Sequence, residues 1–184
     1  MIDSGMIECA RLTTENDFLF AESWRLYESA FPVEERRSLR CHIAAMTSAP
    51  DFYCYALHND EGFVGILFYW LFGDCVYIEH LAIDAAKRGQ GLGAAALRVA
   101  QQHRLPVILE IEPVQDEKTA RRLRFYERAG YHCLPFEHYQ LPYQRGKKPL
   151  RLVLLSYPEP ANAQQTASFE QAYHARPMQY RDAQ

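Results

Sequence analysis

The stretch KRGQGLGAAALRVAQQHR, residues 87–104, decides the fold. Two cations and three glycines lead directly into an alanine-rich and leucine-rich segment that predicts a helix. Glycine lets main-chain N–H groups come close to a ligand, and the first turn of a helix carries a partial positive charge that favours an anion. The residues by themselves therefore indicate a cradle for a phosphate group where this helix begins.

Strand patterns lie on both sides of this loop. Residues 52–58 and 63–72 are rich in aromatic and β-branched residues and flank a polar turn, which is typical of a hairpin. Residues 75–84 predict a third strand that runs into the glycines. After the helix, residues 106–113 form an apolar strand pattern bounded by two prolines, and residues 116–130 have helical spacing and end in a glycine. The predicted order is therefore strand, loop, helix, strand, helix.

The N-terminal part of the chain predicts one strand and two helices. Residues 6–12 look like a short strand, and Thr13 or Thr14 is placed to cap a helix that runs through Tyr27. We expect a second helix over residues 33–46, because a proline stands just before it and acidic residues lead the basic ones.

The C-terminal part changes in composition. Residues 131–134 and 150–156 predict two more strands, separated by a proline-bearing loop. Beyond them proline, alanine, glutamine and asparagine dominate. We therefore expect residues 1–156 to form a single domain and residues 157–184 to form a polar tail, with one short helix near residues 169–174.

Composition limits the class of protein. The 184 residues fit one domain, and 48% hydrophobic residues are enough to fill a core. A net charge of -3 offers no general attraction to nucleic acid or to an anionic membrane. The five cysteines lie far apart without a C-x-x-C pair, which argues against a disulfide framework or a zinc site. Because we find no leader pattern and no apolar stretch long enough to span a bilayer, we expect a cytoplasmic protein.

The glycines also fit the G-x-G-x-x-A pattern of dinucleotide-binding proteins, with Glu110 about 20 residues further on. In such proteins the strand enters the first glycine almost directly, whereas here residues 84–88 intervene and three predicted strands precede the unit. A Walker loop fits less well, because no Gly-Lys-Ser/Thr follows at the required spacing. A nicotinamide site is therefore a distant alternative.

Residues 88–93 match the (Gln/Arg)-x-x-Gly-x-(Gly/Ala) signature of the GCN5-related N-acetyltransferases, and the chain resembles that family. The similarity continues through VILEIEP and LRFYERAGYH, so it covers residues 52–156 in the family's order. FPVEERRSLR and HYQLPYQRGKKPLRLVLLS are similar to a branch of small bacterial acetyltransferases. The resemblance implies an α/β fold with a mixed, mostly antiparallel sheet of about six or seven strands, flanked by helices and splayed between two parallel central strands.

The resemblance also implies acetyl-coenzyme A (acetyl-CoA) as co-substrate, with no metal. In the family, the main-chain N–H groups of the glycine loop bind the pyrophosphate, and an N–H group of the preceding strand meets the thioester carbonyl. Thr119 stands where many members carry an asparagine that contacts the cofactor, which puts that contact in doubt. The positions that carry over are Arg88, Gly89, Gln90, Gly91, Leu92, Gly93 and Ala94 in the loop, Leu81 or Ala82 with Ile83 in the strand, and Thr119 and Tyr126 in the later helix.

Acyl transfer to an amine needs a base for the ammonium proton and an acid for the leaving thiolate. Glu79 is the first candidate for the base, and Glu110 and Glu112 share one face of the next strand. Glu79 has a structural alternative, as the partner of an arginine or of His80, although His80 is expected on the opposite face of the strand. Tyr126 matches the family tyrosine that often protonates the thiolate.

Residues near the acceptor are harder to assign. By family position, the segment between the first two helices lies beside the acceptor site, so Glu34, Glu35, Arg36 and Arg37 are candidates to select the substrate; they equally fit a solvated helix start. Tyr139 and Tyr143 could line the same pocket or anchor a surface loop.

We expect an N-acetyltransferase that acts by direct attack in a ternary complex. The acceptor is expected to be a small-molecule amine rather than a protein, and the chain a monomer or a homodimer. The alternative from another class is a non-catalytic module that binds and senses acyl-CoA. It would keep the phosphate cradle and use the glutamates structurally.

Overall fold

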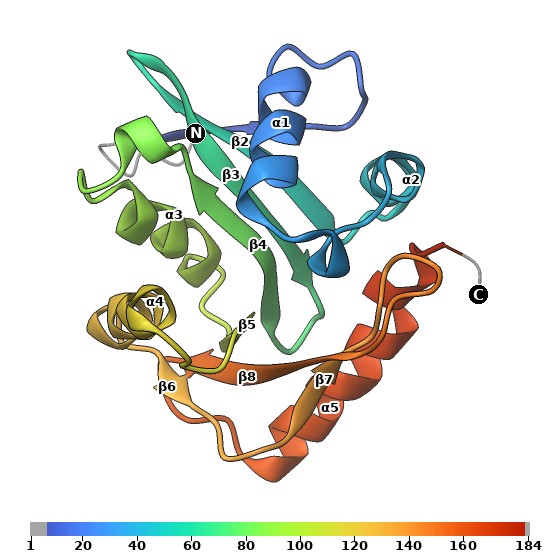
Figure 1. The fold of residues 1–184 in the computed structure, drawn as a ribbon, viewed down its shortest axis with the longest axis vertical. Helices are drawn as coiled ribbons and strands as arrows, with labels where there is room; N and C mark the ends of the chain where they lie inside the picture. The colour runs from blue at the N-terminus through green and yellow to red at the C-terminus, as the bar shows by residue number, and fades with distance from the viewer. Residues whose placement is uncertain (1–6, 183–184) are drawn as a thin grey trace.

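Residues along the central strands alternate between two hydrophobic clusters, one on each face of a sheet. In β3, Ile66, Phe68 and Trp70 belong to one cluster and Leu67 and Tyr69 to the other, and all five are buried. A sheet that is apolar on both faces needs cover on both. Helices α1, α2 and α5 contribute to the first cluster and helices α3 and α4 to the second (Figure 1).

The computed structural model describes residues 7–182. The strands are β1 (Glu8–Arg11), β2 (Phe52–Asn59), β3 (Gly62–Leu71), β4 (Val76–Ile83), β5 (Val107–Ile111), β6 (His132–Cys133), β7 (His138–Gln140) and β8 (Leu150–Tyr157). The helices are α1 (Phe20–Ala30), α2 (Leu39–Ser48), α3 (Leu92–Gln101), α4 (Glu117–Arg128) and α5 (Ala163–Ala175), with short 3₁₀ turns η1 (Val33–Glu35), η2 (Ala85–Lys87) and η3 (Pro177–Gln179). Within this described range, no helix is long and apolar enough to cross a membrane.

The sheet has the order β1-β2-β3-β4-β5-β8-β6, with β7 also paired to β8. Strands β4 and β5 are parallel, and the other pairings are antiparallel. Strand β4 pairs with β5 only from Val76 to Ile78, whereas it remains paired with β3 as far as Ile83. The mixed, mostly antiparallel sheet splayed between two parallel strands is therefore confirmed, with eight strands because the short strand β7, which the sequence did not predict, also pairs with β8.

A β-bulge interrupts β4 just where the two strands part. Phe68 pairs with His80 and Tyr69 pairs with Ile78, so Glu79 is the extra residue on β4. An extra residue breaks the alternation of faces. Glu79 and His80 consequently lie on the same face, with Nδ1 of His80 3.9 Å from Oε2 of Glu79. The expectation that His80 opposes Glu79 was wrong because the strand is not regular.

The second helix begins later than expected. Only η1 forms at residues 33–35, and Arg36 is extended (φ −116°, ψ 142°). Helix α2 begins at Leu39, because the Ser38 side chain accepts a hydrogen bond from the main-chain N–H of Cys41 and so caps it. The expected helix over residues 33–46 is therefore a 3₁₀ turn, an extended link and then a helix.

The C-terminal region contains more structure than one short helix. Helix α5 has 13 residues and begins with a capping box between Asn162 and Gln165. Phe169 and Tyr173, four residues apart, are fully buried and pack edge-on to Tyr77 of β4. The expectation of a polar tail was wrong here, because two large aromatic residues in a polar segment are enough to fix the helix on the sheet.

Candidate active site

The glycine loop leaves a row of main-chain N–H groups exposed at the start of α3. Gly91 is the N-cap residue and has a left-handed conformation (φ 77°), as does Gly89 (φ 81°). Because Gly91 has no side chain, nothing caps the helix, and the first N–H group bonded to the loop belongs to Ala95. Between Arg88 and Ala94, no main-chain N–H group donates to an acceptor in the described part of the chain. This arrangement suits an anion.

Gly93 has a different role in the same loop. It is helical, and a Cβ atom added to it would lie 3.1 Å from the Phe125 ring of α4. Glycine at this position therefore lets α3 and α4 pack closely. Gln90 and Leu92 provide backbone between the glycines, and Leu92 is buried in the core.

The free edge of β4 can be identified from its hydrogen bonds. The carbonyl oxygen of Ala82 points towards Gly65 of β3, since a Cβ atom added to Gly65 would lie 2.5 Å from it. The main-chain N–H of Asp84 also donates to β3, to the carbonyl of Val64 at 2.9 Å. Main-chain groups of successive residues point to opposite edges of a strand. Ala82 therefore faces β3 and cannot serve a ligand in the splay.

By the same alternation, Leu81 and Ile83 direct their N–H and C=O groups to the edge that β5 has left. The Ile83 carbonyl already accepts a hydrogen bond from Nε of Arg88 at 3.2 Å. This bond anchors the arginine of the glycine loop to the end of the strand. Of the two residues considered for the thioester contact, Leu81 has the orientation that the contact needs.

The side chain of Glu79 is completely buried in a network of hydrogen-bond donors. Its carboxylate accepts hydrogen bonds from Arg37 (2.6 Å), from the Trp70 indole (3.1 Å) and from the Tyr143 hydroxyl (2.5 Å). The side chains of Glu79 and Arg37 are both 0% exposed. Burial by itself raises the pKa of Glu79, but the Arg37 guanidinium outweighs burial and lowers the pKa to about 2. Glu79 is therefore an anion at physiological pH. Its contacts favour the structural role, as the partner of an arginine, over the role of general base.

Glu110 is also tied up in a buried network. Its carboxylate accepts a hydrogen bond from the Tyr77 hydroxyl at 2.6 Å and contacts Nε2 of His138, whose other ring nitrogen contacts Glu170 of α5. Burial lowers the pKa of His138, but the two carboxylates outweigh burial and raise it to about 9. His138 is therefore a cation held between two anions. Glu112, two residues after Glu110, is one-third exposed and forms an ion pair with Arg122 of α4.

Glu35, the last residue of η1, is attached to β4 near the point where β4 and β5 part. Its main-chain carbonyl accepts a hydrogen bond from Nε2 of His80 on β4 at 2.8 Å. Burial raises the pKa of Glu35 to about 7, and the nearby charge of Glu112, the residue that follows β5, adds to the effect. Within the described chain, no lysine or arginine lies within ion-pair distance of its carboxylate, although Arg122 lowers the pKa slightly.

His80 has the properties of a buried packing residue. It is 2% exposed, and burial lowers its pKa to about 4, so the ring is neutral at physiological pH. A neutral imidazole that donates from Nε2 holds the η1 turn in place. The contacts of His80 therefore fit a structural role rather than a catalytic one.

Other contacts fix the η1 turn from the outside. The side-chain amide of Gln144 donates to the Arg36 carbonyl at 3.1 Å, and Lys147 forms an ion pair with Glu34 at 3.4 Å. Arg36 itself pairs with Glu28 of α1. Of the two loop tyrosines, Tyr143 is buried on Glu79, and Tyr139 in β7 is 48% exposed. The turn is therefore held against the sheet rather than solvated on all sides.

Tyr126 and Thr119 lie in α4, which covers the face of the sheet opposite the Glu79 network. The Tyr126 ring is 8% exposed and packs against Phe125 and Tyr131. Burial raises its pKa to about 12, so the phenol stays protonated. Thr119 forms a reciprocal capping box with Asp116, and this use of its hydroxyl competes with a cofactor contact.

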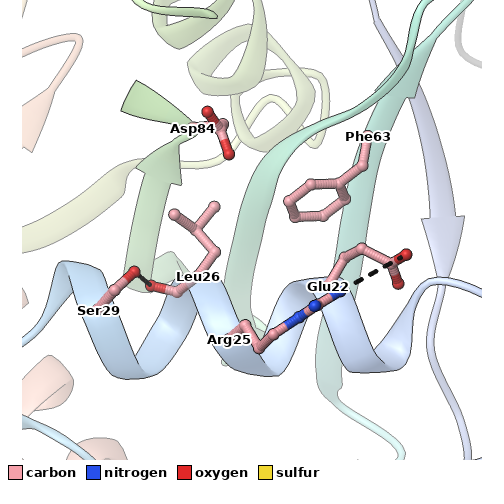
Figure 2. A pocket seen from close by; sticks show the side chains of 6 residues that line it. All are labelled: Glu22, Arg25, Leu26, Ser29, Phe63 and Asp84. Atoms are coloured by element: carbon pink, nitrogen blue, oxygen red, sulfur yellow. Dashed lines mark hydrogen bonds and ion pairs between the residues drawn. The ribbon is translucent and has the colours of Figure 1, made fainter. Parts of the chain in front are cut away.

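A separate hollow of about 360 Å³ lies between α1 and the ends of β3 and β4 (Figure 2). Its walls carry both charges, and Asp84 at the end of β4 points into it beside Leu26 and Phe63 (Figure 2). None of the glutamates discussed above lines it. The residues that line it are Glu22, Arg25, Leu26, Ser29, Phe63 and Asp84.

A splayed mixed sheet with an open helix N-terminus after its fourth strand defines a class of acetyltransferases. Residues 16–131 match the sequence model of the Acetyltransferase (GNAT) family, and the chain belongs to this family. The resemblance found in the sequence is thus confirmed. Acetyl transfer that depends on acyl-CoA is the general activity of the family.

Individual relatives agree with this assignment. A protein of Bacillus subtilis (strain 168) named "Putative acetyltransferase YjbC" is 36% identical over 103 residues, which are 55% of this chain and 52% of that protein. The chain therefore matches about half the length of this curated relative. A GNAT-family structure from Bacteroides thetaiotaomicron is similar with a TM-score of 0.83 and 25% identity, over 91% of this chain and 96% of that one. The ribosomal-protein-S18-alanine N-acetyltransferase from Escherichia coli shares the fold, with a TM-score of 0.59 and 16% identity over 86% and 97% of the two chains.

The sequence did not identify Glu35 as a candidate for the general base. It predicted only that Glu35, with the other charged residues of the FPVEERR segment, lies beside the acceptor site and selects the substrate. The signal that could have been used is the pair of acids directly after Pro32, since one of them must leave solvent when the chain turns onto the sheet. Which one does so depends on η1, and that turn has no clear sequence pattern.

Proposed function

We propose that the protein transfers the acetyl group of acetyl-CoA to a primary amine of a small molecule by direct attack in a ternary complex. The observation that carries this proposal is the position of Glu35. Its main-chain carbonyl is bonded to His80 of β4, two residues beyond the last β4–β5 pair, and its carboxylate is within electrostatic reach of Glu112, with its pKa raised to about 7. A carboxylate with such a pKa is a suitable base for an ammonium group at neutral pH.

The co-substrate would bind along the free edge of β4. The N–H groups from Arg88 to Ala94 and the positive end of α3 would hold the pyrophosphate, with Arg88 beside them. Of the main-chain N–H groups on this edge, that of Leu81 would stabilise negative charge on the thioester oxygen. Acetyl-CoA supplies an activated acyl group, and these residues bind and orient it.

Proton transfer would involve two side chains on different elements. Glu35 would accept the proton of the acceptor's ammonium group, which frees the nitrogen lone pair to form the new C–N bond. As the C–S bond breaks, the Tyr126 phenol would give its proton to the thiolate, and the second proton that the attacking nitrogen loses would pass through solvent to the tyrosine oxygen. Its pKa of about 12 keeps it protonated until then. Of the two candidates Glu79 and Glu35, Glu35 is the better base, because Glu79 is sealed in an ion pair.

Glu110 and Glu112 would act without taking the proton. Glu110 is committed to His138, and Glu112 to Arg122. Their negative charges help keep the pKa of Glu35 high, and they make the surroundings of the acceptor favourable for a cationic amine.

The proposal is tested by binding first and turnover second. A ligand that binds only the folded protein raises its melting temperature, so acetyl-CoA and coenzyme A should raise it and NAD should not. The protein is then incubated with acetyl-CoA and a panel of amines comprising polyamines, aminoglycosides, amino acids and short peptides, and acetylated products are detected by mass spectrometry. Coenzyme A binding without any acetylated product would favour the sensing module. No response to coenzyme A would contradict both functions.

A further inference from the structure

Arg37 is a cation that has been removed entirely from water. Its side chain is 0% exposed, and each guanidinium nitrogen has an acceptor. Nη1 donates to Glu79 at 2.6 Å, Nε donates to the Tyr180 carbonyl at 2.9 Å, and Nη2 donates to the Pro177 carbonyl at 3.1 Å. The guanidinium also lies over the Tyr143 ring, 4.5 Å from its centre. A buried ion pair is a poor device for stability alone and is more useful for fixing one geometry.

The geometry that Arg37 fixes is that of the η1 turn. Arg37 follows Glu35 by two residues, and its own main-chain N–H donates to the buried hydroxyl of Tyr27 at 2.9 Å. The turn is thus attached to β4 twice in succession, to Glu79 through Arg37 and to His80 through the Glu35 carbonyl. The next residue of β4 is Leu81. One set of contacts therefore fixes both the base and the N–H group proposed to face the thioester.

The other half of the attachment comes from the C-terminal segment, which we define as residues 177–182. Besides the two carbonyls that hold Arg37, its Asp182 carboxylate accepts hydrogen bonds from Ser38 at 2.9 Å and from Arg40 at 3.2 Å. The Asp182 main-chain N–H donates to the Tyr143 carbonyl at 2.8 Å. These residues lie beyond residue 131, where the match to the family ends.

We infer that Arg37 is a positioning residue for Glu35, and that the C-terminal segment completes the acceptor side of the active site by holding Arg37 against Glu79. The inference rests on the proposed function, because it needs Glu35 as the base. It gives the C-terminal segment a role in turnover, although the segment contains none of the proposed reacting groups.

Arg37→Lys is the most direct test. Lysine keeps the charge opposite Glu79 but has no planar fork, so it cannot reach all three acceptors. Glu79→Gln makes the complementary change, because the amide keeps an acceptor oxygen and loses the charge. Arg25→Lys, the same exchange at a largely exposed arginine of α1, is the matched control.

The readout is the titration of the Glu35 side-chain carboxyl carbon by NMR, assigned with Glu35→Gln, which requires no known acceptor. The expected result is a pKa near 7 in the unmodified protein and in Arg25→Lys, and a fall of about one unit or more in Arg37→Lys and Glu79→Gln, because a released turn exposes Glu35 to water. Once an acceptor is known, kcat/KM of Arg37→Lys and Glu79→Gln should fall about tenfold or more, while their Kd for acetyl-CoA stays within about twofold of that of the unmodified protein.

A Glu35 that still titrates near 7 in folded Arg37→Lys and Glu79→Gln would overturn the inference. If neither single variant melts cooperatively, Arg37→Met combined with Glu79→Met removes both buried charges and is judged by the same titration. Failure of the proposed function would give a different experimental result. In that case Glu35→Gln would remain fully active, while the titration would still report whether Arg37 holds the turn.

Discussion

The main-chain carbonyl of Glu35 and Nε2 of His80 are 2.8 Å apart, and this hydrogen bond joins the α1–α2 connection to β4 at the bulge. The bond brings a carboxyl group with a raised pKa to the place where β4 and β5 separate. Neither residue is near the other in the sequence. The active site proposed above depends on this contact.

Replacing Glu35 with glutamine should lower kcat/KM by about 100-fold or more, since a general base contributes roughly 10²–10⁴-fold. In the unmodified protein kcat/KM should rise with pH through about 7, because the carboxylate form is the active one, and this step should vanish in the variant. Glu117→Gln, which removes an exposed ion pair to Arg124 within α4, is the control. The melting temperature of Glu35→Gln at pH 8 should be unchanged or higher, because the variant no longer holds a disfavoured charge. A variant with full activity would exclude Glu35 as the base.

The phosphate cradle can be tested at Gly91. Aspartate there should weaken acetyl-CoA binding by about 100-fold or more, because the new carboxylate repels the pyrophosphate and the residue must adopt φ 77°. Gly73→Asp introduces the same change at a similar positive φ in the β3–β4 turn, and it should leave the affinity intact. Isothermal titration of both variants with acetyl-CoA gives the comparison. Equal affinities would mean that the loop is only a turn.

The local parts of the fold could be predicted from the sequence. The glycine loop, the strands around it and the helix of Tyr126 all lie within one continuous stretch, where hydrophobic period and turn residues determine the structure. The family relationship could be read from the same residues. Leu81 could be chosen over Ala82 only when the pairing with β3 was known.

The non-local parts could not be predicted. Two of the three hydrogen-bond donors to Glu79, Arg37 and Tyr143, are 42 and 64 residues away in the sequence, and no spacing rule joins them to it. A bulge has no strong sequence pattern, so the faces of Glu79 and His80 were assigned as if the strand were regular. Helix α5 was underestimated because its polar composition conceals two aromatic residues that the sheet buries.

Tyr126→Phe tests the proposed acid. The variant removes only the hydroxyl group, so kcat should fall by about 100-fold while the Kd for acetyl-CoA changes by less than about twofold. Tyr131→Phe, at a ring 5.7 Å from that of Tyr126, makes the same change beside it and should keep kcat. Stopped-flow measurement of free thiol release separates chemistry from product release. Equal kcat values in the two variants would assign Tyr126 a packing role.

The His138 network predicts how stability depends on pH. The folded-state pKa of His138 is about 9, above the ordinary value of 6.5, because Glu110 and Glu170 favour the cation more than burial disfavours it. A raised pKa stabilises the fold fully below pH 6.5, and this contribution is lost as the pH rises through about 9. The difference between these two pKa values corresponds to roughly 3 kcal/mol. His138→Gln should therefore lower the free energy of unfolding most at pH 6, and the difference from the unmodified protein should shrink between pH 6.5 and 9.

Urea unfolding at pH 6, 7.5 and 9 measures this difference directly. His174→Gln is the control, because His174 reaches the same Glu170 at 3.8 Å but is 53% exposed, and a surface pair contributes little. Its effect should be small at every pH. A constant difference between His138→Gln and the unmodified protein over this range would mean that His138 is not a cation in the folded state. Glu110 would then lack the cation that pairs with it.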